Sequence, residues 1–255
     1  MVRARDRSVV DAEYKVDKYK AALGFARAKP TNDPFDVRMF EFGHDAQADW
    51  CFSRGDELFR APLAEIQTIF DDWLTDKVLH AAPGSRSIVE TGCGYGYNLA
   101  LLARAHPSRA YFGGDLASTA VELADHLYGK GGSPRVEAFD YYSAKYDLLD
   151  RIEGPVTVFT CHSIEQLPTA APFLDALKRH ARKIAGVVHF EPIFEVHGPN
   201  LLGRLRRAHA ESLDYNRDLL TLLNSRADIA VQSVEPNVLG LNPLNPTTFI
   251  HWTFR

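Results

Sequence analysis

The sequence predicts an α/β fold: a doubly wound sheet of seven strands, mostly parallel but with an antiparallel last strand, preceded by an N-terminal helical extension. Two observations lead to this fold class. From about residue 86 onward, short β-rich runs alternate with helical patterns, which is typical of a parallel sheet with helices on both faces. The last two β-rich runs have no convincing helical pattern between them, so we expect a hairpin there, with "NVLGLNPLNPT" as its turn.

The individual elements follow in order along the chain. The β-rich runs begin with "SIVET" and end with "TFIHWTF", and they predict strands at 87–91, 110–115, 135–140, 156–161, 185–191, 229–235 and 248–254. The helical patterns between them predict helices at 96–105, 117–128, 170–183 and 211–224. This part of the chain, 86–255, is therefore expected to form the main domain.

Residues 1–85 form a different kind of segment. Helical patterns cover about 11–27 and 62–80, and the stretch between them has weak periodicity and resembles a long irregular loop. Its aromatic residues argue against disorder; they are Phe35, Phe40, Phe42, Trp50 and Phe52. It also carries polar side chains suited to orient a ligand, namely Arg38, Glu41, His44, Asp45 and Arg54. We therefore expect residues 11–60 to form a lid and one wall of a pocket, the alternatives being a cap on the far side of the sheet or a dimer contact.

Composition excludes several classes of protein. Of the 255 residues, 45% are hydrophobic and 24% charged, as in an ordinary globular protein. A net charge of -4 gives no overall basic footprint for nucleic acid. The three cysteines form no CxxC pair, which argues against disulfides and thiolate zinc and favours a reducing, cytoplasmic setting. The charged N-terminus lacks the apolar core of a secretory signal, and no apolar run is long enough for a membrane span.

The stretch "SIVETGCGYGYNLALLARAHPSRAYFGGDLA", 87–117, places three glycines between two acids. Glycine permits positive φ and lets a ligand approach the backbone, so a strand that feeds a helix through such a loop is typical of a nucleotide-cofactor site. The dinucleotide pattern GxGxxG fails because its last position is Tyr97. Instead the pattern is ExGxGxG, starting at Glu90, and Asp115 closes the next strand, where a carboxylate can bind both ribose hydroxyls of an adenosine.

These residues, with "FDYY" after the third strand and the terminal hairpin, resemble motif I and the following acidic motif of class I S-adenosylmethionine-dependent methyltransferases. The resemblance covers residues 86–255 and implies a Rossmann-like sheet with S-adenosylmethionine as cofactor. It places Glu90 at the amino group, Asp115 at the ribose and Leu116 on the adenine. The other positions that it implies for the cofactor site are Gly92, Gly94, Gly96, Asp140, Tyr141 and Cys161. Asp140 could instead only cap a helix, and Tyr141 could belong to the core.

Candidate catalytic residues follow the fourth and fifth strands. The resemblance places His162 beside the transferred methyl group, where an alcohol acceptor benefits from a base. His189 and Glu191 share one face of a strand, and this histidine–carboxylate pair could act as a second general base. A histidine at a strand end is nevertheless often structural. Residues expected at the acceptor are Phe42, Trp50, Tyr215 and Asn216. No metal is expected, because no acidic pair follows the fourth strand; a facial triad of His162, His189 and Glu191 is the alternative.

The favoured function is methylation of a small polar acceptor, such as a natural product or sugar-type hydroxyl, at oxygen. The alternative is N-methylation of a small molecule. A nucleic-acid or protein methyltransferase is disfavoured, because "CHSI" stands where amino-group enzymes of this fold carry Asn/Asp-Pro-Pro-aromatic. A non-catalytic binder would not need an intact glycine loop with both acids. Arg204, Arg206 and Arg207 could bind an anion or form a solvated helix face. Neither a membrane nor a nucleic-acid partner is expected, and a homodimer is left open.

Overall fold

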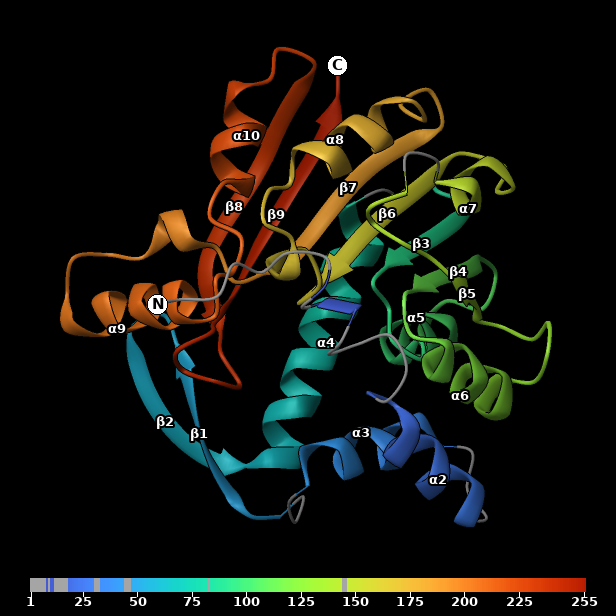
Figure 1. Cartoon of the computed structure of the whole chain (residues 1–255), viewed down its shortest axis with the longest axis horizontal. Coiled ribbons are helices and arrows are strands. Elements are labelled where there is room, and N and C mark those ends of the chain that lie inside the picture. Colours follow the sequence, from blue (N-terminus) through green and yellow to red (C-terminus); the bar gives the residue numbers. More distant parts are fainter. Residues whose placement is uncertain are drawn as a thin grey trace.

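The computed structural model describes residues 8, 10–11, 18–29, 33–43, 47–81, 83–143 and 146–255. In this part of the chain a seven-stranded sheet has the order β5-β4-β3-β6-β7-β9-β8 (Figure 1). Its strands are β3 (Ser87–Thr91), β4 (Ala110–Asp115), β5 (Arg135–Ala138), β6 (Val156–Cys161), β7 (Ile184–Glu191), β8 (Ile229–Leu239) and β9 (Thr247–Phe254). No helix among the described residues is long and apolar enough to cross a membrane.

The predicted fold class is confirmed. Strands β3 to β7 pair in parallel, whereas β9 is antiparallel to both of its neighbours, β7 and β8. A parallel pair needs a crossover between its strands, and here helices supply it, whereas β8 and β9 are joined by a short loop. All five parallel strands therefore end at one edge of the sheet, where an open α/β sheet binds its ligands.

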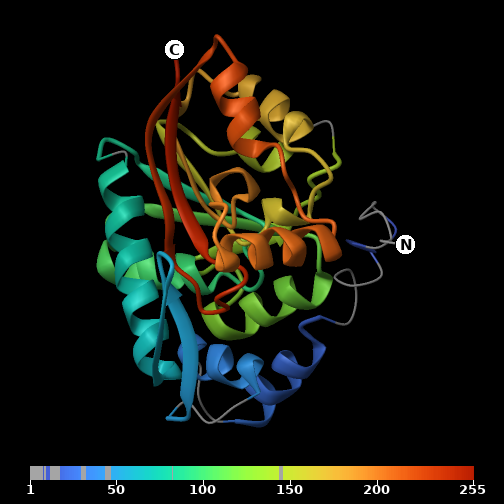
Figure 2. The same cartoon turned by 90° about the vertical axis from the view of Figure 1, so that its left-hand side faces the viewer.

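Helices cover both faces of the sheet, as Figure 2 shows edge-on. One core contains α4 (Leu63–Ala81), α5 (Tyr97–Ala105) and α6 (Ser118–Tyr128), and the other contains α7 (Asp147–Asp150), α8 (Ala171–Lys178) and α10 (Leu219–Ser225). Successive strand residues alternate between the cores: Val188 belongs to the first and Val187 to the second. Both are fully buried, so neither face of the central sheet is left to solvent.

The predicted irregular loop between the two N-terminal helical patterns is wrong. The structure has a helix there, α3 (Pro34–Phe42), and a hairpin of β1 (Asp49–Arg54) and β2 (Glu57–Pro62). Asp33 caps α3 by accepting a hydrogen bond from the Phe35 N–H. The hairpin is attached to the β8–β9 loop by two backbone hydrogen bonds between Ser53 and Gly240. Periodicity missed the hairpin because most of β2 is exposed and lacks a buried face.

Two other helix predictions need correction. The expected helix at 211–224 is two helices, α9 (Leu201–Ser212) and α10, because Asp214 has φ of 51° and the Asn216 side chain caps α10 at the Leu219 N–H. In the pattern at 11–27, α2 (Lys20–Ala28) is described, while 12–17 lie outside the described residues.

Within the arginine cluster, Arg206 on α9 is fully buried and pairs with Asp56 of the hairpin turn, so it fastens the hairpin and leaves the cluster incomplete as an anion site.

Candidate active site

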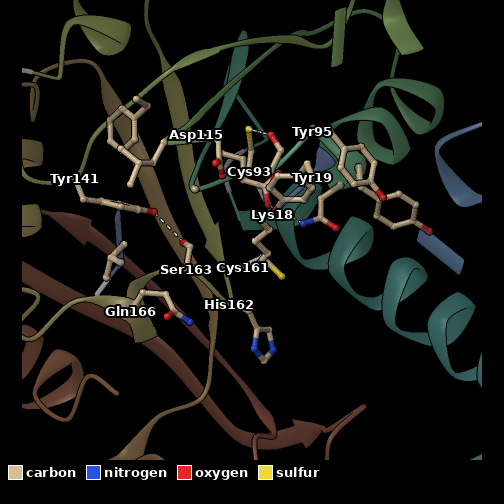
Figure 3. A pocket seen from close by; sticks show the side chains of 18 of the residues that line it. Lys18, Tyr19, Cys93, Tyr95, Asp115, Tyr141, Cys161, His162, Ser163 and Gln166 are labelled. Carbon is tan, nitrogen blue, oxygen red and sulfur yellow. Dashed lines mark hydrogen bonds between the residues drawn. The ribbon is translucent and has the colours of Figure 1, made fainter. Parts of the chain in front are cut away.

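A cavity of about 360 Å³ opens at the carboxyl ends of β3, β4 and β6 (Figure 3). The sheet side is contributed by the loops after these strands, with Glu90, Asp115 and Cys161 among the lining residues. The opposite side comes from the N-terminal segment, which contributes Lys18, Tyr19, Arg38 and Phe42. Its size is within the range of sites for small molecules, roughly 300–1,000 Å³.

The three glycines of the loop all have positive φ, but only two of them line the cavity. A Cβ on Gly92 would lie 2.4 Å from the Ser163 Cβ, and one on Gly94 would lie 2.6 Å from the Tyr19 hydroxyl. These two glycines line the cavity. Gly96 does not; it caps α5, and its missing Cβ makes room for Val136. The structure thus places Gly92 and Gly94, but not Gly96, where a ligand could contact them.

The floor of the cavity holds two buried acceptor atoms without partners among the described residues. Glu90 is 1% exposed; its Oε1 accepts from the Asn98 side chain at 2.7 Å, while its Oε2 has no hydrogen-bond partner. Asn98 Oδ1 is also buried without a partner. Burial raises the pKa of Glu90, and the hydrogen bond from Asn98 and the charge of Arg38 oppose the shift. Two unpaired acceptors facing one cavity suit a ligand with an ammonium group, as the amino-acid end of S-adenosylmethionine has.

The Asp115 carboxylate stands at the other end of the glycine loop. Its Oδ2 accepts from the Gly94 N–H at 2.7 Å and its Oδ1 from the Ala117 N–H at 2.9 Å. Burial raises the pKa of Asp115, against these hydrogen bonds and the charge of Lys18. Leu116 and Asp140 line the same end of the cavity. Asp115 therefore both holds the loop and faces the position expected for a ribose.

Tyr141 also lines the cavity, and its hydroxyl bridges two strand ends. It donates to the Thr91 carbonyl at 2.6 Å and lies 2.9 Å from the Ser163 hydroxyl (Figure 3). The Asp140 side chain accepts from the Tyr142 N–H, so it also stabilises the turn after β5. Both residues thus meet the cavity as the resemblance implies, and both also have structural partners.

His162 directly follows β6 and projects into the cavity. Its φ is 48°, a left-handed conformation that is uncommon outside glycine and that is often found at functional sites. Its Nδ1 is 3.4 Å from a carboxylate oxygen of Glu165 and its Nε2 is 2.7 Å from the Thr247 hydroxyl. Burial acts to lower the pKa of His162, but Glu165 and Glu191 outweigh it and raise the pKa.

Glu191 and His189 lie behind this end of the cavity and do not line it. The Glu191 carboxylate accepts from the Ser163 N–H at 3.0 Å and holds the turn that carries His162; burial and the nearby Glu165 raise its pKa to about 7. His189 is fully buried, and its nitrogens are occupied by the Thr160 hydroxyl and by the Trp252 indole N–H. Burial lowers the pKa of His189 to about 3. Of these three residues only His162 lines the cavity, whereas Glu191 holds the turn after β6 and His189 packs in the core.

The expected acceptor residues are divided. Phe42 lines the cavity, whereas Trp50 packs behind it and donates from its indole to the Leu241 carbonyl at 2.8 Å. Tyr215 and Asn216 do not line the cavity; Asn216 is buried and donates to the Leu167 carbonyl. Two polar residues expected in the lid, His44 and Asp45, lie outside the described residues.

Several cavity residues were missed in the sequence. They include Asn98, the second residue of α5, and the amide side chains of Asn242 and Asn245. Asn98 could have been found from its place beside motif I, and the two asparagines from the hairpin loop that ends at the same sheet edge. Within the described ranges, no group of three or more His, Cys, Asp or Glu side chains is arranged to hold a metal ion.

Comparisons with known proteins identify the fold. No protein-family model and no curated protein matches this sequence. A solved structure of geranyl diphosphate C-methyltransferase from Streptomyces coelicolor A3(2) superimposes with a TM-score of 0.53 at 12% identity, over 94% of this chain and 98% of that one. An O-methyltransferase family protein from Burkholderia thailandensis gives a TM-score of 0.53 at 14% identity, over 76% of this chain and 57% of that one. Geranyl diphosphate methyltransferase in complex with geranyl diphosphate and sinefungin gives 0.50 at 14% identity, over 76% and 79%. Together with the strand order and the antiparallel β9, these likenesses show that the chain has the class I methyltransferase fold.

Proposed function

We propose that this protein is an S-adenosylmethionine-dependent methyltransferase that methylates a small polar molecule, with a hydroxyl oxygen as the favoured acceptor. The observation that carries the proposal is a pair of buried acceptor atoms without partners among the described residues, Glu90 Oε2 and Asn98 Oδ1, on two residues that line a cavity at the glycine loop. A fold shared with methyltransferases gives the context, and S-adenosylhomocysteine was bound in the geranyl diphosphate enzyme. Fold alone would not establish an activity, so the proposal depends on the site.

The residues would bind the cofactor as follows. Glu90 and Asn98 would accept from its ammonium group, the backbone of Gly92 and Gly94 would line its binding site, and Asp115 would accept from its ribose hydroxyls. When bound, S-adenosylmethionine supplies a methyl group activated by a sulfonium sulfur. The protein's main task is then to hold the acceptor in line and close to that methyl group.

The chemistry on the acceptor side centres on His162. Glu165 faces its Nδ1 at 3.4 Å, which favours the tautomer with the proton on that nitrogen. Nε2 is then the accepting nitrogen, and in this structure it is 2.7 Å from the Thr247 hydroxyl. An acceptor hydroxyl that replaces Thr247 as the donor would give its proton to Nε2, so His162 would serve as the base on the acceptor side.

The remaining lining of this part of the cavity supports a small, partly apolar acceptor. Amides of Gln166, Asn242 and Asn245 offer hydrogen bonds, and Phe42 and Leu241 offer apolar contact. The net charge of -4 gives no general attraction to nucleic acid.

Two measurements test the proposal. Isothermal calorimetry with S-adenosylhomocysteine should show binding to the full chain and a loss of about 10-fold or more in Glu90→Gln, which cannot pair ionically with an ammonium group. Incubation with methyl-labelled S-adenosylmethionine and a size-fractionated cell extract should transfer label to the small-molecule fraction. Absence of S-adenosylhomocysteine binding would refute the enzyme proposal, and label confined to protein or nucleic acid would refute the acceptor class.

A further inference from the structure

The cations around the cavity occupy different places. Among the described residues, Lys18, Arg38 and His162 supply the cationic or protonatable side chains of its lining. Lys18 acts on the carboxylate of Asp115, at the ribose end, and His162 faces Glu165. The charge of Arg38 opposes the rise that burial causes in the pKa of Glu90 and of the Cys161 thiol, which stand at the ends of β3 and β6, and it also acts to lower the pKa of His162. A ligand ammonium bound at Glu90 would therefore lie in the neighbourhood of Arg38.

Two aromatic rings flank the Arg38 guanidinium. Its Cζ lies 5.5 Å from the ring centre of Phe42 and 5.2 Å from that of Tyr97. Glu41, one turn along α3, forms an ion pair at 3.8 Å, which is longer than a hydrogen bond, and that carboxylate also accepts from the Tyr95 hydroxyl at 3.0 Å. Neither the ring contacts nor the 3.8 Å ion pair is a hydrogen bond, so guanidinium N–H groups are available to bind a carboxylate in a bidentate manner.

Arg38 also has donor capacity that the protein does not use. Its Nε is buried and has no hydrogen-bond partner within the described part of the chain. The same cavity contains the unused acceptors Glu90 Oε2 and Asn98 Oδ1. A donor and two acceptors that no described residue uses, all on residues that line one cavity, are complementary to a single group with both a carboxylate and an ammonium, which is an α-amino acid.

We infer that Arg38 binds the carboxylate of the cofactor's methionine moiety, across the cavity from Glu90 and Asn98, which accept from its ammonium group. The inference rests on the proposed function and assigns Arg38 to the cofactor rather than to the acceptor. It also gives α3 a role: Phe42 lies one turn after Arg38 on the same helix, so the bound amino-acid group positions the residue that lines the acceptor side.

A comparison of three ligands by calorimetry tests the inference on the full chain. S-adenosylhomocysteine has both charged groups, 5′-deoxy-5′-(3-aminopropylthio)adenosine lacks only the carboxylate, and 5′-methylthioadenosine lacks the whole amino-acid group. Arg38→Gln should weaken S-adenosylhomocysteine by about 10- to 100-fold and change the other two by less than about threefold. Arg38→Lys should give an intermediate loss for S-adenosylhomocysteine alone, since it keeps the charge without the planar fork.

The control is Arg104→Gln, an exposed arginine on α5 that pairs with Asp33 outside the cavity lining; it should leave all three affinities unchanged. Equal losses for all three ligands in Arg38→Gln, or no loss for any, would overturn the inference while the proposed function stands. If no ligand loses affinity, Arg38 would instead be a candidate for binding the acceptor. If Arg38→Gln does not fold, Arg38→Lys decides by the same comparison. Failure of the unaltered protein to bind S-adenosylhomocysteine would overturn the proposed function and this inference together.

Discussion

Replacing Gly92 by alanine tests whether the glycine loop and the turn after β6 are packed as closely as the structure shows. Gly92 has φ of 71°, and a Cβ there would lie 2.4 Å from the Ser163 Cβ and 2.8 Å from its Oγ. Ser163 cannot easily move away. Its N–H donates to both Glu191 oxygens at 3.0 Å, and its hydroxyl donates to the Thr91 carbonyl at 3.1 Å.

The expected cost has two parts. A left-handed conformation costs a residue with a Cβ about 1–2 kcal/mol, and overpacking a well-packed site costs about 1–3 kcal/mol. We therefore expect Gly92→Ala to lower the free energy of unfolding by about 2–5 kcal/mol, which a domain of ordinary stability survives. Gly43 is a matched control: its φ is 65°, and nothing lies within 4 Å of its Cβ position. Gly43→Ala should cost only the first part.

Urea unfolding followed by circular dichroism measures these differences. Most of the packing part should be recovered in Gly92→Ala/Ser163→Gly, which removes the two nearest atoms and leaves the Tyr141 hydroxyl at 3.0 Å, but not in Gly92→Ala/Ser163→Ala, which keeps the Ser163 Cβ. Each double variant is compared with its own Ser163 single variant. If Gly92→Ala is no more destabilising than Gly43→Ala, the close approach of the loop to Ser163 is refuted.

Three further predictions concern the site and the core. Asp115→Ala should weaken S-adenosylhomocysteine by about 2–3 kcal/mol in calorimetry, because a charge-assisted contact is lost; an unchanged affinity would contradict its assignment. His162→Ala should lower kcat about 100-fold with little change in cofactor affinity. Because the pKa of His162 is raised above 6.5, the acid limb of the pH–rate profile should lie above that value, where the base form is lost as pH falls; a limb at or below 6.5 would argue against His162 as the base. His189, whose pKa is about 3 in the folded protein and about 6.5 when unfolded, should cost stability as pH falls below 6.5, by about 2 kcal/mol between pH 7 and 5. His189→Gln should remove that part of the pH dependence in urea unfolding, and an identical slope in both proteins would show that His189 does not cause it.

Local patterns predicted most of the sheet. The strand at 87–91 was predicted to the residue, and so were those at 110–115 and 156–161, because short β-branched and aromatic runs between turn residues indicate a buried strand without reference to the rest of the chain. The hairpin β1–β2 was missed for the converse reason. It is stabilised by attachment to Gly240 and Arg206, far away in the sequence, and leaves little periodic burial in its own residues.

The sequence by itself determined the fold class and the part of the cavity lining at the glycine loop, because strand periodicity, the loop glycines and the acids at strand ends are local features. Only the tertiary structure decided which side chains meet. In the folded chain His189 is buried in the core against Trp252, and Arg38 of α3 lines the same cavity as Glu90. The physical reason is that burial and charge pairing depend on elements distant in the chain, which no local pattern specifies. A histidine near the end of a parallel strand can therefore pack in the core, as His189 does within β7, or line the cavity, as His162 does directly after β6.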